Sequence, residues 1–151
     1  MNKKKRVTYW LLLTVWLGVI FSFSAQGGDK SGGLSRTITE GVLNIIKPLD
    51  REAVFETVHF LIRKGAHFTE YAVLGSLWSN VFSTYPRLNR HLLPTAASAS
   101  VISAALDEFH QSFVRGRVPA VTDVLIDSVG GLTGVLITMA LIYRSNKKAE
   151  K

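Results

Sequence analysis

Side chains able to bind a ligand or transfer a proton gather in three separate stretches of this sequence. They are Arg63, Lys64, His67 and Glu70 in the first stretch, Asp107, Glu108, His110 and Gln111 in the second, and Arg115, Arg117, Asp123 and Asp127 in the third. Carboxylates and imidazole rings can exchange protons in general acid–base catalysis. Arginine and lysine bind phosphate or carboxylate, and arginine does so through a bidentate fork. The residue types therefore suit a polar site, provided that the fold brings the three stretches together.

Long apolar runs contain or flank these stretches and predict membrane-spanning helices. A helix that crosses the hydrocarbon core of a bilayer needs about 20 apolar residues. Runs of this kind cover residues of about 7–25, 60–82, 92–113 and 120–143. Only 19% of the residues are charged, and the charges stand in blocks, whereas a soluble domain alternates them with apolar residues. The sequence therefore predicts an all-α integral membrane protein with four transmembrane helices in a small bundle, which forms a single domain over residues 1–151.

The first two runs are joined by a segment that predicts a further helix. Residues 26–33 predict a loop because they are rich in glycine. Residues 34–47 carry apolar side chains at helical spacing and predict an amphipathic helix on the membrane surface or against the bundle. Pro48 would end this helix, and Asp50 suits the N-cap of the next one. The first run could also be a cleaved signal peptide, but it exceeds the usual apolar length of about 7–15 residues, so we predict a retained span.

Basic residues predict which ends of the helices face the cytoplasm. Lysine and arginine in short connecting segments favour that side of the membrane. Basic groups lie in segments 3–6, 87–91 and 144–151, which places both termini in the cytoplasm. The turn that carries Arg115 and Arg117 then faces outward, as a mild exception to the rule. With this topology all three ionisable stretches lie at one membrane depth, near the outer surface.

Helical spacing places these side chains on the faces that pack. Arg63, His67, Glu70 and Leu74 share one face; Ser100, Ser103, Ala104, Asp107 and Gln111 share a second; Asp123, Asp127, Gly130 and Gly134 share a third. Small residues at such spacing let membrane helices approach closely. An ionisable group at membrane depth costs roughly 2.5–3.5 kcal/mol on insertion scales, so it turns inward and finds a partner. The sequence therefore predicts one polar cluster inside the bundle.

Composition excludes several classes of function. The chain has no cysteine, so it has neither disulfides nor thiolate chemistry. The net charge of +7 lies largely at the two ends, and no basic face with interleaved aromatic residues predicts nucleic-acid binding. His67, Glu70 and Asp107 could in principle hold a metal ion, but no dense ligand motif is present. We therefore predict no nucleic acid, no metal and no cofactor.

Two motifs resemble those of the VanZ-like family of small bacterial membrane proteins. The first is RKGAHFTEY at residues 63–71 with Leu74 and Gly75, and the second is DEFHQSFVRGR at 107–117, followed by DVLIDSVGG at 123–131. The resemblance covers about residues 7–143. Asp127 departs from it, since the family more often has Asn at this position. The resemblance implies a small protein with four helices in a bacterial membrane. The family's namesake is associated with low-level teicoplanin resistance, but the resemblance implies no molecular activity.

Four interpretations of the cluster remain open. The first is an outward-facing pocket for a cell-envelope component, such as a cell-wall precursor or another anionic headgroup, with a possible effect on glycopeptide susceptibility. Its predicted ligand-binding residues are Lys64, His67, Glu70, Asp107, Gln111, Arg115, Arg117, Asp123 and Asp127. The second is a membrane-embedded hydrolase or transferase on a lipid-linked substrate, with His67, Glu70, Asp107 and Glu108 as catalytic candidates and none assigned. The third is a structural cluster of ion pairs with no site. A proton-coupled transporter is the weakest alternative.

Overall fold

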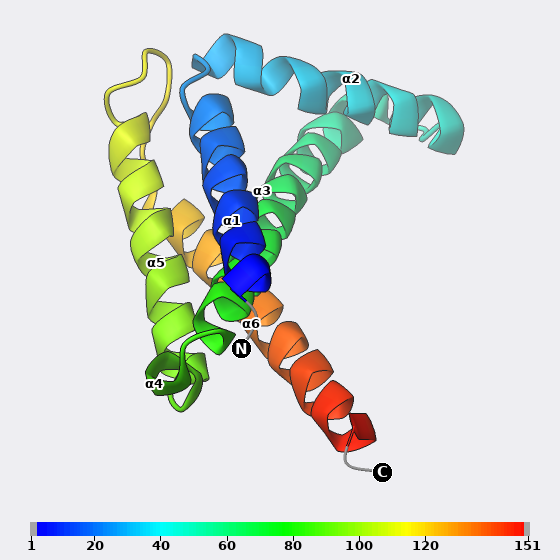
Figure 1. The fold of residues 1–151 in the computed structure, drawn as a ribbon. Coiled ribbons are helices and arrows are strands. Elements are labelled where there is room, and N and C mark those ends of the chain that lie inside the picture. Colours follow the sequence, from blue (N-terminus) through cyan, green and yellow to red (C-terminus); the bar gives the residue numbers. More distant parts are fainter. Residues whose placement is uncertain (1–2, 150–151) are drawn as a thin grey trace.

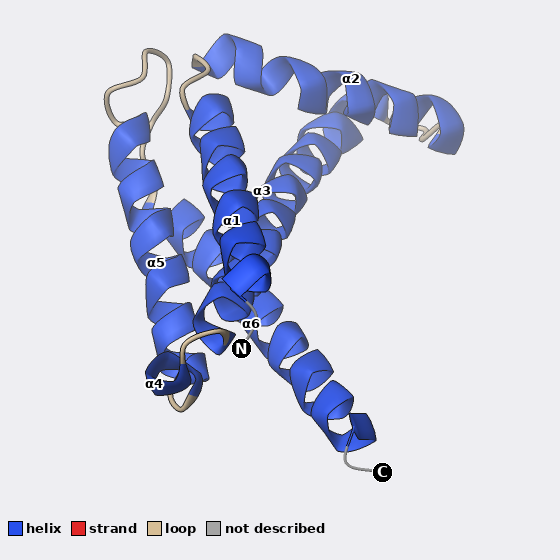
Figure 2. Ribbon diagram, viewed as in Figure 1, coloured by secondary structure: helices blue, strands red, loops and turns tan. Residues whose placement is uncertain are grey.

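Six helices make up almost all of the described chain. A computed structural model describes residues 3–149, with the side chains of 28–32 and 149 left aside. The helices are α1 (Lys3–Ser24), α2 (Gly28–Ile46), α3 (Arg51–Ser83), α4 (Pro86–Asn89), α5 (Leu92–Gln111) and α6 (Val121–Ala149). Figure 2 shows short loops between them and no strand within residues 3–149. The all-α prediction is therefore confirmed.

The long helices pack around α3, and α2 lies across one end of them (Figure 1). The last turn of α1, all of α2, the first turns of α3 and the 112–120 loop gather at this end, which we call the α2 end. The start of α1, α4 and the C-terminal part of α6 lie toward the opposite end. Arg6 fixes that arrangement, because its guanidinium donates to the carbonyl oxygen of Thr84 over 3.3 Å and lies 4.4 Å from the ring centroid of Tyr85.

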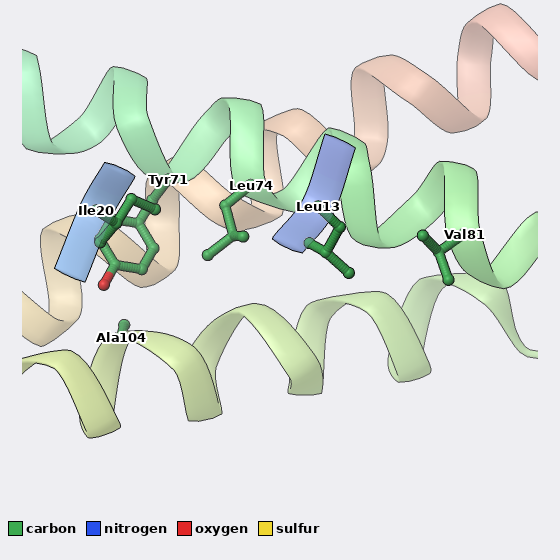
Figure 3. Close-up of a cluster of buried hydrophobic side chains, with 6 residues drawn as sticks. All are labelled: Leu13, Ile20, Tyr71, Leu74, Val81 and Ala104. Carbon is green, nitrogen blue, oxygen red and sulfur yellow. The ribbon is translucent and has the colours of Figure 1, made fainter. Parts of the chain in front are cut away.

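A buried apolar cluster joins α1, α3 and α5 (Figure 3). Its members are Leu13 and Ile20 of α1, Tyr71, Leu74 and Val81 of α3, and Ala104 of α5. In Figure 3, Tyr71 and Leu74 extend from α3 toward α5, where the small side chain of Ala104 leaves room for the phenol ring. The predicted stripe of small residues on α5 therefore packs against α3, as expected from its composition.

Glycines bring α3 and α6 into direct backbone contact. A Cβ atom at Gly130 would overlap the carbonyl oxygen of Phe68, and one at Gly134 would overlap that of Ala72. Gly75 faces α6 in the same way, because a Cβ there would overlap the carbonyl oxygen of Gly131. The prediction that the Gly130–Gly134 face packs closely is confirmed.

Within residues 3–149, length and composition identify two candidate membrane spans, rather than the four predicted. They are Lys3–Ser24 and Val121–Lys148, by length and apolar character alone. Helix α3 is not one of them, because its more apolar half, residues 66–83, still contains Glu70 and many polar side chains. Helix α5 does not meet it because it is rich in Ala and Ser and ends with acidic residues.

Helix α2 begins earlier than the sequence predicted. Residues 28–33 were expected in a loop, but α2 starts at Gly28, so that expectation is wrong. Glycine and serine weaken a helix without forbidding it, and the surrounding structure often overrides so weak a preference. The C-terminal end of α2 agrees with the prediction that Pro48 would end this helix. Lys47 adopts the left-handed conformation with φ 48°, directly before Pro48. Asp50 caps α3 as predicted, since its side chain accepts a hydrogen bond of 3.0 Å from the amide of Ala53.

Candidate functional site

A cavity of about 160 Å³ lies at the α2 end of the bundle. It is bounded by the last turn of α1, the first half of α2, the first half of α3 and the 112–120 loop. The lining residues are Phe23, Ser24, Gln26, Leu34, Ser35, Ile38, Ile62, Arg63, Ala66, His67, Glu70 and Arg117. The lining combines aliphatic side chains of α2 and α3 with ionisable side chains of α3 and the loop. The cavity is therefore amphipathic.

Two arginines bring positive charge to this cavity. Arg117 is held in place because its Nε donates to the carbonyl oxygen of Gln26 over 3.2 Å and its Nη2 to that of Phe23 over 3.3 Å. Nη1 of Arg117 and Nε of Arg63 are buried and have no hydrogen-bond partner within residues 3–149. Burial and then the charge of Arg63 lower the pKa of Arg117 from its usual value, although a guanidinium stays protonated in proteins. The two cations therefore line the same cavity and repel each other, and each has a donor without a partner within residues 3–149.

His67 lines the cavity with a carboxylate behind it. Its Nδ1 lies 3.7 Å from Oδ1 of Asp127, which belongs to α6 and does not line the cavity. Asp127 is 1% exposed. Neither Nδ1 of His67 nor Oδ1 of Asp127 has a hydrogen bond within the described chain. The other ring nitrogen, Nε2, is not among the buried atoms that lack a partner.

Glu70 brings the negative charge of the cavity. Among the described lining residues it alone carries a carboxylate. Its position on α3 is supported by α1, because the indole nitrogen of Trp16 donates to the carbonyl oxygen of Glu70 over 3.0 Å. Two guanidinium groups against one carboxylate leave the cavity with an excess of positive charge.

Lys64 and Asp123 neutralise each other beside the cavity. The Lys64 ammonium forms a close ion pair with Oδ1 of Asp123, and the two side chains are 18% and 10% exposed. This contact joins α3 to the first turn of α6. Neither residue lines the cavity, so the pair acts in packing.

The acidic residues at the end of α5 are also engaged in packing. Oδ2 of Asp107 accepts hydrogen bonds of 2.7 Å from the hydroxyl of Ser24 and 2.9 Å from the side-chain amide of Gln111. Glu108 accepts a hydrogen bond of 2.6 Å from the backbone amide of Ala120, just before α6 begins. These contacts tie α5 to α1 and to the loop. Asp107, Glu108 and Gln111 lie outside the cavity lining.

The predicted ligand-binding residues therefore separate into groups. His67, Glu70 and Arg117 line the cavity. The side chains that lie behind or beside it are Lys64, Asp107, Gln111, Asp123 and Asp127. Arg115 is exposed on the loop and does not line the cavity. Of the catalytic candidates, His67 and Glu70 reach the cavity and Asp107 and Glu108 do not.

The sequence prediction did not include part of the cavity. Arg63 was placed on the same helical face as His67 but was left out of the ligand-binding set, and this spacing was the signal for it. Ser24, Gln26 and the wall from α2 carried no such signal, because they reach the cavity only through tertiary packing. No group of three or more His, Asp or Glu side chains within the described residues is arranged to hold a metal ion.

The sequence was compared with known proteins. No curated protein and no solved structure matches the chain significantly. The family model described as VanZ/LLP1 matches residues 9–143, which include every helix that forms the cavity. The chain therefore belongs to the VanZ/LLP1 family.

Proposed function

We propose that the protein crosses a bacterial cell membrane with α1, α3, α5 and α6, with both termini in the cytoplasm and the α2 end outside. The outer faces of the bundle support this proposal, because large apolar side chains on them are uncovered: Val15 is 65% exposed, Ile102 58% and Ile137 54%. Soluble monomers seldom leave broad apolar surfaces uncovered. The charges of α3 do not prevent a span, because they do not need to face lipid. Lys64 pairs with Asp123 of α6, and Arg63, His67 and Glu70 line the cavity.

Helix α2 suits the membrane interface. Leu34, Ile38, Ile45 and Ile46 are between 46% and 83% exposed, and the helix lies across the others in Figure 1. An amphipathic helix in this position can bury its apolar face among headgroups and the first acyl carbons. The basic segments at 3–6 and 144–148 lie toward the opposite end, where the anionic surface of the cytoplasmic leaflet attracts them.

We further propose that the cavity binds the anionic headgroup of a cell-envelope lipid. The observation that carries this proposal is that Arg63 and Arg117 both line the cavity, repel each other, and each have a donor without a partner within residues 3–149, while one lining residue carries a carboxylate. An anion between two guanidinium groups relieves their repulsion and accepts hydrogen bonds from both. The cavity volume of about 160 Å³ is below the ~300–1,000 Å³ of a drug-sized pocket. A headgroup therefore fits inside, while the aliphatic wall of α2 leads its tail toward the bilayer.

Replacing Arg63 by Gln is expected to weaken headgroup binding strongly. A hydrogen bond to a charged group contributes about 1.5–3 kcal/mol, which corresponds to a Kd about 10–100-fold higher. We would measure binding of dioctanoyl phosphatidic acid to the full chain in lipid nanodiscs by microscale thermophoresis. Arg63→Lys keeps the charge without the bidentate fork, so its Kd should fall between those of Arg63→Gln and the wild type.

Arg115→Gln is the matched control for this measurement. Arg115 has the same side chain as Arg117 and lies two residues away on the loop, but it is exposed and outside the cavity. We expect its Kd to equal that of the wild type. Equal affinities for the wild type and Arg63→Gln, or a loss of affinity in Arg115→Gln alone, would contradict the proposed site.

A cell-wall precursor is one lipid with a headgroup of this kind. Because the family's namesake is associated with low-level teicoplanin resistance, we extend the proposal to glycopeptide susceptibility in cells. The corresponding measurement compares cells that express wild-type protein with cells that express Arg63→Gln. The wild type should raise the inhibitory concentration of teicoplanin and the variant should not.

A further inference from the structure

The cavity contains two arginines that can bind an anion, and also a histidine with a carboxylate next to it. Anion binding alone does not explain the pair of histidine and carboxylate. His67 lines the cavity, and its Nδ1 lies 3.7 Å from Oδ1 of Asp127. A carboxylate buried behind a histidine fixes the ring orientation and stabilises the imidazolium that forms when the outer nitrogen takes up a proton. Catalytic hydrogen bonds are often long before substrate binds.

We propose that this cavity hydrolyses the terminal phosphate of a lipid phosphomonoester or diphosphate, with His67 as the general base and Asp127 as its positioning residue. This inference rests on the proposed headgroup site and names its substrate class. The terminal phosphate carries up to two negative charges and three non-bridging oxygens. Arg63 and Arg117 supply two positive charges, and Nε of Arg63 and Nη1 of Arg117 have no partner within residues 3–149. The charge and the spare donors of the two arginines therefore match a terminal phosphate.

The reaction needs no group beyond water and these side chains. Nε2 of His67 takes one proton from a water molecule as the water oxygen forms a bond to phosphorus. The bond from phosphorus to the bridging oxygen breaks, and that oxygen keeps the electron pair and takes a proton from solvent. His67 then returns its proton to solvent. The products are inorganic phosphate and a lipid alcohol or lipid monophosphate. Arg63 and Arg117 stabilise the charge on the non-bridging oxygens.

Asp127 fits the positioning role better than the other carboxylates. Asp107 is already the acceptor for Ser24 and Gln111, and Asp123 is paired with Lys64. Asp127 lies next to His67, is 1% exposed, and has an oxygen without a hydrogen bond within residues 3–149. The glycines of α6 bring it this close, because Gly130 lets the backbone of α6 approach Phe68 of α3.

The test measures phosphate release by the full chain in nanodiscs. Dioctanoyl phosphatidic acid and farnesyl diphosphate serve as probes, and the probe that reacts distinguishes a glycerolipid from a polyprenyl source. We expect the wild type to release phosphate from at least one of them. Asp127→Asn should lower kcat about 100-fold or more with KM changed less than threefold, and Asp127→Glu should restore part of kcat. A merely structural role would instead move KM and kcat together. His67→Gln should be inactive.

Glu56→Gln is the matched control, because it also neutralises a carboxylate, on an exposed position of α3 outside the cavity. Its kcat should equal that of the wild type. Binding of both probes without phosphate release from either would overturn the catalytic inference and leave the headgroup site standing. Absence of binding would overturn both. Activity retained in His67→Gln would also overturn the inference, and that variant remains available if Asp127→Asn does not fold.

Discussion

Gly134→Ala is expected to lower the free energy of unfolding by at least about 2 kcal/mol, although alanine is the better helix former. A methyl group at this position would overlap the carbonyl oxygen of Ala72, which belongs to the backbone of α3 and cannot rotate away. Overpacking usually costs about 1–3 kcal/mol, and here α3 and α6 must separate along their whole contact. The measurement is chemical unfolding of the purified chain in mixed micelles.

The same substitution at Gly65 is the control and should have the opposite sign. Gly65 lies on α3, and a Cβ atom there would meet nothing within 4 Å. Glycine within a helix is about 0.8–1 kcal/mol less favourable than alanine, so Gly65→Ala should stabilise by about that amount. If both variants shift the unfolding midpoint in the same direction and by similar amounts, then helix propensity governs these sites and the close α3–α6 contact is wrong.

Helical periodicity in the sequence predicts the close contact between α3 and α6, because it shows which residues share a helix face. Gly130 and Gly134 stand four residues apart, and no large side chain lies between them on that face. The cap at Asp50 and the end of α2 before Pro48 are equally local features, and the structure agrees with both. The start of α2 is different. Residues 28–33 have only a weak local preference against a helix, and contacts with the rest of the chain determine their conformation.

The cavity depends on features that periodicity does not report. The sequence predicted one cluster at one depth, but depth does not define the direction in which each carboxylate points. Asp107 faces Ser24 of α1, Asp123 faces Lys64, and Asp127 faces His67. These pairings follow from how far each helix is rotated about its axis, and rotation is determined by packing against several neighbours at once. For the same reason the wall from α2 was not predicted.

Lys64 and Asp123 offer the sharpest test between a structural and a ligand-binding role. Their side chains are 18% and 10% exposed and form an ion pair between α3 and α6. Lys64→Met is expected to lower the free energy of unfolding by about 3–5 kcal/mol, because it leaves a buried carboxylate without its cation. The hydroxyl of Thr122 lies 3.4 Å from Oδ1 of Asp123. It is uncharged, so it replaces the lost Lys64 ammonium only weakly.

The double variant Lys64→Met with Asp123→Leu is expected to recover most of that loss. Replacing both members of a buried ion pair by apolar residues of similar volume is often neutral or stabilising, because neither charge then has to be desolvated. The measurement is a double-mutant cycle by chemical unfolding, accompanied by the Kd for dioctanoyl phosphatidic acid. A stable double variant with the wild-type Kd assigns the pair to packing. A stable double variant that no longer binds would instead make both residues part of the ligand site, as the sequence suggested, and would move that site from the α2 cavity toward α6.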